Sequence, residues 1–129
     1  MNKLSAVYPL AIEHAKKKIF EDIDYYIGSK ECLPTFQEYK HERIHYIEQI
    51  WVNVWLNKAT NDVPRKEKRQ FLKERGIETE GVDRKIINKI FRNEIRNYQP
   101  FDVIQWLDHT FLNNSPLWEE RHQKARQDF

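Results

Sequence analysis

The sequence predicts an all-α fold, a compact bundle of five to six helices in one domain that covers residues 1–129. Only three residues are glycine, and the chain has six valines and four threonines. Tight hairpins need glycine and strands favour β-branched residues, so this composition argues against a β fold. Between the glycines and prolines, apolar residues recur at helical spacing. A chain of 129 residues can bury a core without disulfides or structural metal, so we expect a globular protein.

A first helix is expected to begin between Ser5 and Pro9 and to end at Gly28. Glycine is favoured just after a helix, where the backbone turns left-handed, so Gly28 is expected at the C′ position. One apolar stripe runs along this segment and predicts its buried face. The stripe consists of Ile12, Ile19, Phe20, Ile23, Tyr26 and Ile27.

The second helix is expected to start at Thr35 and to run to about Lys58. Thr35 and Glu38 have the spacing of a capping box, in which each side chain accepts a hydrogen bond from the other residue's backbone N–H. The apolar arc of this helix is wide, which indicates either a helix central in the bundle or one half-covered by a partner. The arc consists of Phe36, Tyr39, Ile47, Ile50, Trp51, Val54 and Trp55.

Prolines and glycines divide the middle of the chain into shorter helices. A connection at 61–64 is followed by a short helix expected over 65–75, which Gly76 stops. The next helix is expected over 82–98, and Pro100 stops it because proline cannot continue a helix.

The last part of the chain carries two further helix-start signals. Asp102 with Gln105 predicts a cap for a fifth helix that runs to Leu112. Ser115 at the N-cap and Pro116 at the first helical position predict a sixth helix, since both residue types are enriched there.

The chain shows no sequence sign of a secretory route, a membrane partner or a cofactor. Its one cysteine, Cys32, cannot form an internal disulfide, which suits a cytoplasmic protein. The apolar run at 4–12 meets charged residues at once, so we expect a helix there rather than a signal peptide. The run at 51–56 is far shorter than the ~20 residues that span a bilayer. Without a glycine-rich phosphate loop, we expect no nucleotide cofactor.

The formal net charge of +2 conceals an asymmetry along the chain. Residues 64–99 carry eleven basic and six acidic side chains, a net charge of +5, and the remainder carries −3. Positive charge concentrated in one segment is typical of proteins that bind polyanions. The sequence therefore places a candidate nucleic-acid interface in this segment.

Within the helix expected over 82–98, four cations share one face. Lys85, Lys89, Arg92 and Arg96 follow one another at helical spacing, and the row is roughly 16 Å long at a rise of about 1.5 Å per residue. Such a row can follow a phosphate backbone. The alternative is an ordinary solvated face that tolerates like charges, at a cost of a few tenths of a kcal/mol per pair.

Ten residues are the candidates for contact with nucleic acid, in the basic segment at 65–75 and the basic helix at 82–98. Arginine and asparagine are the types that read base edges, and clustered lysine and arginine hold phosphates. The candidates are Arg65, Lys66, Lys68, Arg69, Arg84, Lys85, Asn88, Lys89, Arg92 and Arg96. Glu94 interrupts the apolar arc of this helix, so its carboxylate must find a partner or reach solvent.

The short helix, the glycine and the basic helix together resemble a helix-turn-helix unit. The residues that carry the resemblance are Phe71, Leu72, Gly76, Ile77 and Val82. The sequence departs from the pattern at Lys85, where an apolar residue is expected and Ile86 follows one place late. The resemblance implies that the second helix of the pair faces DNA. The alternative is two ordinary packed helices.

His41-Glu42-Arg43-Ile44-His45 matches the H-E-x-x-H motif of zinc hydrolases, on a predicted helix. Two histidines one turn apart can share a zinc ion, and the glutamate can polarise its water. Two cationic residues, Lys40 and Arg43, stand where zincins are uncharged, and no third ligand follows at the family's spacing. We interpret the motif as a polar helix face, with a His41/His45 metal site as a remote alternative.

Tryptophan supplies the candidates for a protein interface. Trp51 and Trp55 lie on the wide arc of the second helix, and Trp118 in the last helix is the one we expect to be most exposed. An exposed tryptophan among charged residues suits a partner protein or a homodimer contact. The alternative for Trp118 is a lid that closes the bundle.

The sequence thus favours a small non-enzymatic regulatory or accessory protein that binds nucleic acid. The first alternative is an adaptor or inhibitor that docks on a larger protein assembly through aromatic helix faces. A zinc hydrolase built on the motif at 41–45 is the remote alternative.

Overall fold

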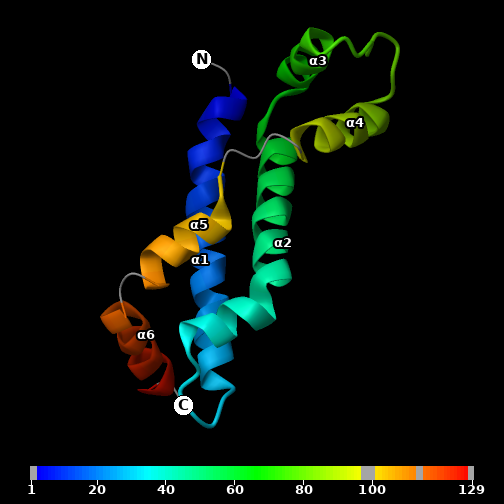
Figure 1. Ribbon diagram of the computed structural model, residues 1–129. Helices are drawn as coiled ribbons and strands as arrows, with labels where there is room; N and C mark the ends of the chain where they lie inside the picture. The colour runs from blue at the N-terminus through cyan, green and yellow to red at the C-terminus, as the bar shows by residue number, and fades with distance from the viewer. Residues whose placement is uncertain (1–2, 97–100, 113–114, 128–129) are drawn as a thin grey trace. The chain divides into compact units, whose positions relative to one another are not determined.

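The computed structural model describes residues 3–96, 101–112 and 115–127. In this part of the chain the regular secondary structure consists of six α-helices and one π-helical turn, with no strands (Figure 1). The predicted all-α fold is therefore confirmed. The elements are α1 (Lys3–Gly28), α2 (Phe36–Asp62), α3 (Arg65–Glu74), α4 (Arg84–Arg96), α5 (Val103–Leu107), the π-helical turn η1 (Asp108–Leu112) and α6 (Ser115–Gln127).

The chain folds into two compact units. Unit 1 comprises Met1–His14 and Val52–Phe101, and unit 2 comprises Ala15–Trp51 and Asp102–Phe129. Helices α1 and α2 each contribute to both units, because the boundaries fall inside them. The expectation of a single domain stays a prediction.

The ends of α1 differ from the sequence prediction. The helix begins at Lys3, earlier than expected, and contains Pro9 in its interior. Gly28 is the last helical residue and does not have a positive φ, so its expected role as a left-handed C′ residue is wrong. Ser29 ends the helix instead, because its Oγ donates to the Tyr26 carbonyl oxygen at 2.8 Å and its N–H donates to the Tyr25 carbonyl oxygen at 3.0 Å.

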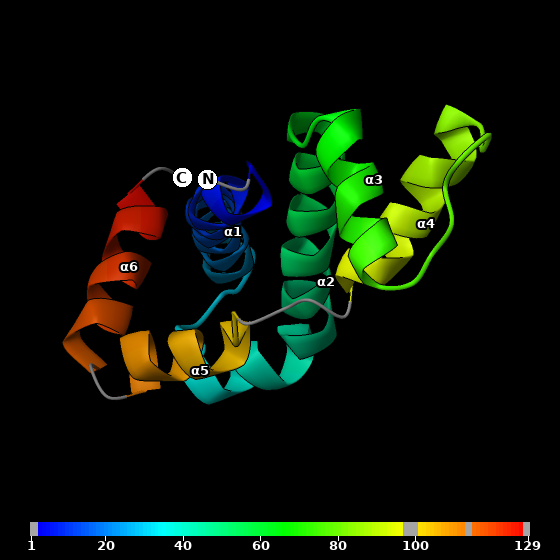
Figure 2. The same ribbon diagram turned by 90° about the horizontal axis from the view of Figure 1, so that it is seen from above.

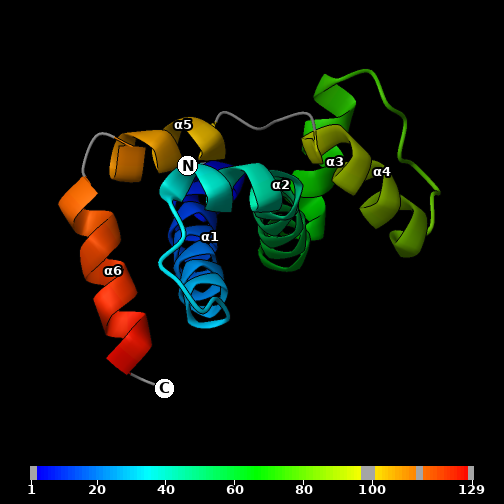
Figure 3. The same cartoon turned by 60° about the horizontal axis from the view of Figure 1, so that its bottom comes forward.

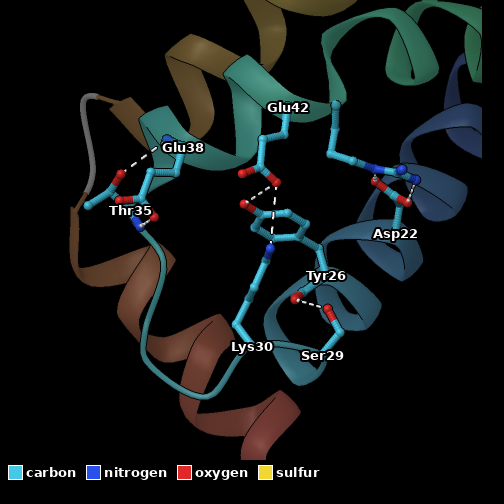
Figure 4. Close-up of polar contacts among 8 residues, drawn as sticks. Asp22, Tyr26, Ser29, Lys30, Thr35, Glu38 and Glu42 are labelled. Carbon is cyan, nitrogen blue, oxygen red and sulfur yellow. Dashed lines mark hydrogen bonds and ion pairs between the residues drawn. The ribbon is translucent and has the colours of Figure 1, made fainter.

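The start of α2 is the capping box that the sequence predicts (Figure 4). The Glu38 N–H donates to Thr35 Oγ1 at 3.1 Å, and the Thr35 N–H donates to Glu38 Oε2 at 3.3 Å. The helix continues to Asp62, beyond the expected end near Lys58. It stops there because the next residue but one is Pro64, which has no N–H to donate.

Helix α3 ends at Glu74, and Gly76 stops it as predicted, in a Schellman motif. Gly76 has φ 77°, its N–H donates to the Lys73 carbonyl oxygen at 3.0 Å, and the Ile77 N–H donates to the Leu72 carbonyl oxygen at 2.9 Å. Helix α4 begins two residues later than expected, where Asp83 Oδ1 accepts the Lys85 N–H at 3.0 Å. Its predicted end at residues 97–98 lies outside the described residues.

The predicted start of the fifth helix is confirmed, and the sixth helix begins one residue earlier than predicted. Asp102 Oδ1 accepts the Gln105 N–H at 3.0 Å and caps α5. The segment continues to Leu112 as expected, but its second half is the π-helical turn η1, where the hydrogen bonds span one residue more than in an α-helix. Helix α6 then begins at Ser115 and runs in a different direction from α5 (Figure 3).

Each unit has its own aromatic core. In unit 2, Phe36, Phe111 and Trp118 pack edge-on or tilted with ring centroids 5.5–5.6 Å apart. In unit 1, Trp55 from α2 is fully buried and lies edge-on to Tyr8 of α1, with ring centroids 5.7 Å apart. None of the described helices has the length and apolarity needed to span a bilayer.

Candidate nucleic-acid interface

Seven of the ten candidate residues for nucleic-acid contact are exposed on unit 1. They are Arg65, Lys66, Arg69, Arg84, Lys85, Lys89 and Arg96. The structure assigns the other three, Lys68, Asn88 and Arg92, to contacts inside the unit. The candidate surface is therefore narrower than the sequence predicts.

Lys68 is buried, so its predicted role in holding phosphates is wrong. Its side chain is 6% exposed, and its Nζ donates to the Thr60 carbonyl oxygen at 2.6 Å and to Asn88 Oδ1 at 3.0 Å. Burial lowers the pKa of the Lys68 ammonium, and the nearby Arg84 and Arg65 lower the pKa further. Lys68 links α3 to both α2 and α4.

Asn88 and Arg92 are half-buried and form hydrogen bonds within the unit, which corrects their predicted role at base edges. The amide oxygen of Asn88 is the acceptor for Lys68. The Arg92 guanidinium donates to the Leu56 carbonyl oxygen at 3.3 Å and to Thr60 Oγ1 at 3.2 Å, both on α2. Helical spacing placed Arg92 in the cationic row, but the nearby end of α2 offers carbonyl and hydroxyl acceptors that hold it.

The rest of the cationic row on α4 remains on the surface. Lys85, Lys89 and Arg96 are exposed, and they span about 16 Å of helix at a rise of about 1.5 Å per residue. Ile86, beside this row, is 52% exposed. Glu94 is partly exposed and reaches solvent, one of the two outcomes expected for it.

A groove along α3 gathers further cations. Its volume is about 430 Å³, and it lies between the exposed face of α3 and the loop that follows. Four cations line it, against one carboxylate, that of Glu78. The cations are Arg65, Lys66, Arg69 and Lys73.

Lys73 was not among the candidates from the sequence. The signal was present, because Lys73 follows Arg69 by four residues and Arg65 by eight, which places all three on one face of a helix. The sequence did not predict that the loop at 77–79 forms the opposite wall of the groove.

The packing of α3 and α4 differs from the resemblance to a helix-turn-helix unit. Nine residues, 75–83, connect the two helices, whereas the turn in that unit has about three or four. Lys68 bonds Asn88, and Phe71 packs edge-on against Phe91 at 5.6 Å. In both pairs the partners are twenty residues apart in sequence, so α3 and α4 run parallel where they touch. The connection therefore doubles back to the start of α4 (Figure 2).

Glu42 and Arg43, two residues of the H-E-x-x-H match, bond α2 to α1 within unit 2. Tyr26 OH donates to Glu42 Oε2 at 2.9 Å, and Lys30 Nζ lies 3.6 Å from the same oxygen (Figure 4). Burial, and then the bond to Glu42, raises the pKa of Tyr26 to about 12. His41 and His45 are exposed. Among the described residues, no three His, Cys, Asp or Glu side chains are grouped so that they could hold a metal ion.

A second polar contact joins the same two helices at Asp22, one turn before Tyr26 on α1. Arg43 Nε donates to Asp22 Oδ2 at 3.2 Å, and Tyr39 OH donates to the same oxygen at 2.9 Å. Burial and the Asp22 charge raise the pKa of Tyr39. The bond to Asp22 raises the pKa of Arg43. Arg43, which the sequence placed near a hypothetical zinc ion, is therefore an ion-pair partner in the fold.

All three tryptophans proposed for a protein interface are buried. Trp51, Trp55 and Trp118 are 2%, 0% and 5% exposed. The expectation that Trp118 is exposed is wrong, because its Nε1 donates to the Pro34 carbonyl oxygen at 3.0 Å and its ring packs on Phe36. Trp118 closes the core of unit 2, the alternative stated for it.

Comparison of the chain with protein-family models, with curated proteins and with solved structures found no match in any of the three. The charge and geometry of the chain itself are therefore the basis for inferring its function.

Proposed function

We propose that this chain is a non-enzymatic accessory or regulatory protein that binds nucleic acid through the basic surface of unit 1. The observation that carries the proposal is the groove along α3, where four cations face a single carboxylate. The exposed row of Lys85, Lys89 and Arg96 lies on α4, the neighbouring helix of the same unit, and adds three further cations. Together these residues form what we call the basic surface.

The chemistry of the basic surface favours contact with phosphates. Each lysine or arginine that neutralises a phosphate releases condensed counterions, so affinity falls steeply as salt rises. Asn88 and Arg92, two of the candidates for reading base edges, are held inside the unit. Phosphate contacts position a protein without carrying sequence information. We therefore expect binding with little sequence preference.

The alternative function, docking on a larger protein through tryptophan faces, has less support. Trp51, Trp55 and Trp118 are in the cores of the two units, so a partner could reach them only after the packing opened. The remote alternative, a zinc hydrolase, would need Glu42 to leave Tyr26 and Lys30. Binding of nucleic acid to the basic surface needs no such rearrangement, because its cations are exposed.

Fluorescence anisotropy of the full chain with labelled duplex DNA, single-stranded DNA and RNA tests the proposal. Binding is measured at about 50 mM and about 200 mM salt, a range over which several phosphate contacts produce a large loss of affinity. The groove variant is Lys66→Glu with Arg69→Glu, and the row variant is Lys85→Glu with Lys89→Glu. We expect each to weaken binding at least about tenfold.

The matched control is Lys17→Glu with Lys18→Glu, two exposed lysines of α1 in unit 2. It makes the same change in net charge as the test variants, away from the basic surface. We expect its affinity to stay within about twofold of the unmodified chain. Equal losses in control and test variants, or no binding of any probe at low salt, would overturn the proposal.

A further inference from the structure

Helix α3 borders a second hollow, on the side away from its cations. This hollow has a volume of about 260 Å³ and lies entirely within unit 1. Gln70 is the one lining residue that it shares with the groove along α3. The residues that line it are Leu4, Val63, Glu67, Gln70, Phe71, Glu74 and Phe91.

Apolar side chains from α1, α3, α4 and the α2–α3 connection form the walls. Leu4, Val63 and Phe91 are buried, and Phe71 is partly exposed. Phe71 packs edge-on against Phe91, and the Arg75 guanidinium stacks 4.1 Å from the Phe71 ring centroid without lining the hollow. An engineered apolar cavity of about 150 Å³ binds benzene, so this hollow has room for one large apolar side chain.

Two carboxylates flank the apolar walls. Glu67 and Glu74 are seven residues apart on α3, about 10 Å along the helix, and Phe71 lies between them. Glu67 Oε2 accepts the Lys3 backbone N–H at 2.8 Å, and Glu74 Oε1 accepts from Gln70 Nε2 at 3.2 Å. Within the described part of the chain, neither carboxylate forms a salt bridge. Their negative charge is therefore not neutralised by an ion pair.

We propose that this hollow is a docking site for a basic amphipathic helix of a partner protein. The helix would insert one large apolar side chain into the hollow, against the ring of Phe71, and place a lysine or arginine about one turn before and after it, opposite Glu67 and Glu74. A helix that lays an apolar face into a groove is a common recognition mode, and the spacing matches residues that share one helix face. Complementary charge fixes its register.

The negative charge of Glu67 and Glu74 also determines which ligands the hollow does not bind. Glu67 and Glu74, which form no salt bridge within the described part of the chain, repel nucleic acid and anionic lipid, because these carry charge of the same sign. Helix α3 thus separates two surfaces of opposite charge, one suited to a polyanion and one to a basic segment. The contact is small, so we expect a dissociation constant on the order of 100 μM for an isolated peptide.

A titration of the full chain against a labelled alanine-based peptide of about 20 residues tests the inference. The peptide carries one phenylalanine, a lysine four residues before it and a lysine three residues after it, and circular dichroism verifies that it is helical. One comparison peptide has glutamate in place of both lysines, and another has alanine in place of the phenylalanine. We expect only the first to bind, and more weakly at high salt.

The test variant is Glu67→Gln with Glu74→Gln, which removes both charges and keeps the acceptors that bond Lys3 and Gln70. We expect it to weaken binding of the lysine peptide at least about fivefold. The matched control, Glu21→Gln with Glu48→Gln, makes the same charge change at exposed positions of unit 2 and should bind as the unmodified chain does. Circular dichroism of both variants verifies that they fold.

Three outcomes would overturn the inference: equal binding of the lysine and glutamate peptides, equal binding by test variant and unmodified chain, or no binding at about 1 mM peptide. Self-association of the chain that Glu67→Gln with Glu74→Gln abolishes would show that a second copy fills the hollow, which also contradicts it. The Lys66→Glu, Arg69→Glu variant should keep peptide binding while losing nucleic acid, so the two proposals can fail separately.

Discussion

Asn88 Oδ1 accepts a hydrogen bond from Lys68 Nζ at 3.0 Å, and this bond joins α4 to α3. The same ammonium reaches the Thr60 carbonyl oxygen on α2 at 2.6 Å. Two residues that the sequence places at a nucleic-acid surface are therefore the connection between three helices.

Loss of the Lys68 side chain should destabilise the protein without depending on any ligand. Lys68→Ala removes both bonds and leaves the Thr60 carbonyl and the Asn88 amide without this donor. We expect the free energy of unfolding to fall by about 1–3 kcal/mol. Urea denaturation followed by circular dichroism measures it. The exposed neighbour Lys66→Ala should change stability by less than about 0.5 kcal/mol, and equal effects would contradict the assignment.

Substitution of Arg92 should lower folding stability and substitution of Lys89 should weaken binding, although both residues lie on the predicted cationic row. Arg92→Ala loses its bonds to the Leu56 carbonyl and the Thr60 hydroxyl and should cost about 1–3 kcal/mol of stability. Lys89 is exposed, so Lys89→Ala should leave stability within about 0.5 kcal/mol and weaken nucleic-acid binding. Paired urea and anisotropy measurements test this. A stability loss in Lys89→Ala as large as in Arg92→Ala would refute the distinction.

Gly76 should tolerate asparagine better than alanine. Its φ is 77°, and a Cβ there would meet no atom within 4 Å, so the cost of substitution is backbone strain rather than a clash. Gly76→Ala should lower the free energy of unfolding by about 1–2 kcal/mol. Gly76→Asn should cost less, because asparagine enters the left-handed region more readily. Thermal unfolding of the two variants gives the comparison, and an equal or larger loss for asparagine would argue against it.

Stability should decline in alkali partly because of Tyr26. Its pKa is raised from 10.0 to about 12 by burial and by its bond to Glu42. Between these two pH values the unfolded chain releases a proton that the folded chain retains, so stability present below pH 10 is lost as pH rises toward 12. Tyr26→Phe should be less stable at neutral pH by about 1 kcal/mol and lose stability less steeply above pH 10.

Urea midpoints at intervals between neutral pH and pH 11.5 follow this effect. Tyr25→Phe is the control, because the Tyr25 side chain is 75% exposed and should contribute little to stability at neutral pH. A slope in Tyr26→Phe as steep as in the unmodified chain would show that other groups cause the alkaline loss.

Trp118 should behave as a core residue. Trp118→Ala empties space against Phe36 and Phe111 and should cost about 3–5 kcal/mol. Trp118→Phe keeps an aromatic ring but loses the donor to the Pro34 carbonyl, so it should cost less, about 1–3 kcal/mol. Chemical denaturation of both variants tests this ranking. A Trp118→Ala protein of unchanged stability would mean that the side chain is not packed in the core.

Local signals predicted much of the secondary structure because their causes lie within a few residues. The Thr35/Glu38 capping box, the stop at Gly76 and the Asp102 cap each depend on neighbours in sequence, and all three are present. The prediction from Gly28 was wrong because Ser29, and not a left-handed glycine, ends α1 through its side-chain bond to the Tyr26 carbonyl oxygen. No comparable local signal in the sequence predicted that residues 75–83 double back to the start of α4.

Composition and periodicity by themselves determined the helical fold, the placement of most helices and the concentration of cations at 64–99, since each depends on residue type and spacing along the chain. Tertiary structure alone decided which cations face solvent, because Lys68 and Arg92 turn inward to acceptors on α2 that are distant in sequence. It also created both hollows beside α3, whose walls come from separate segments. Spacing places a side chain on a helix face, but only the packing of other helices decides whether that face meets water.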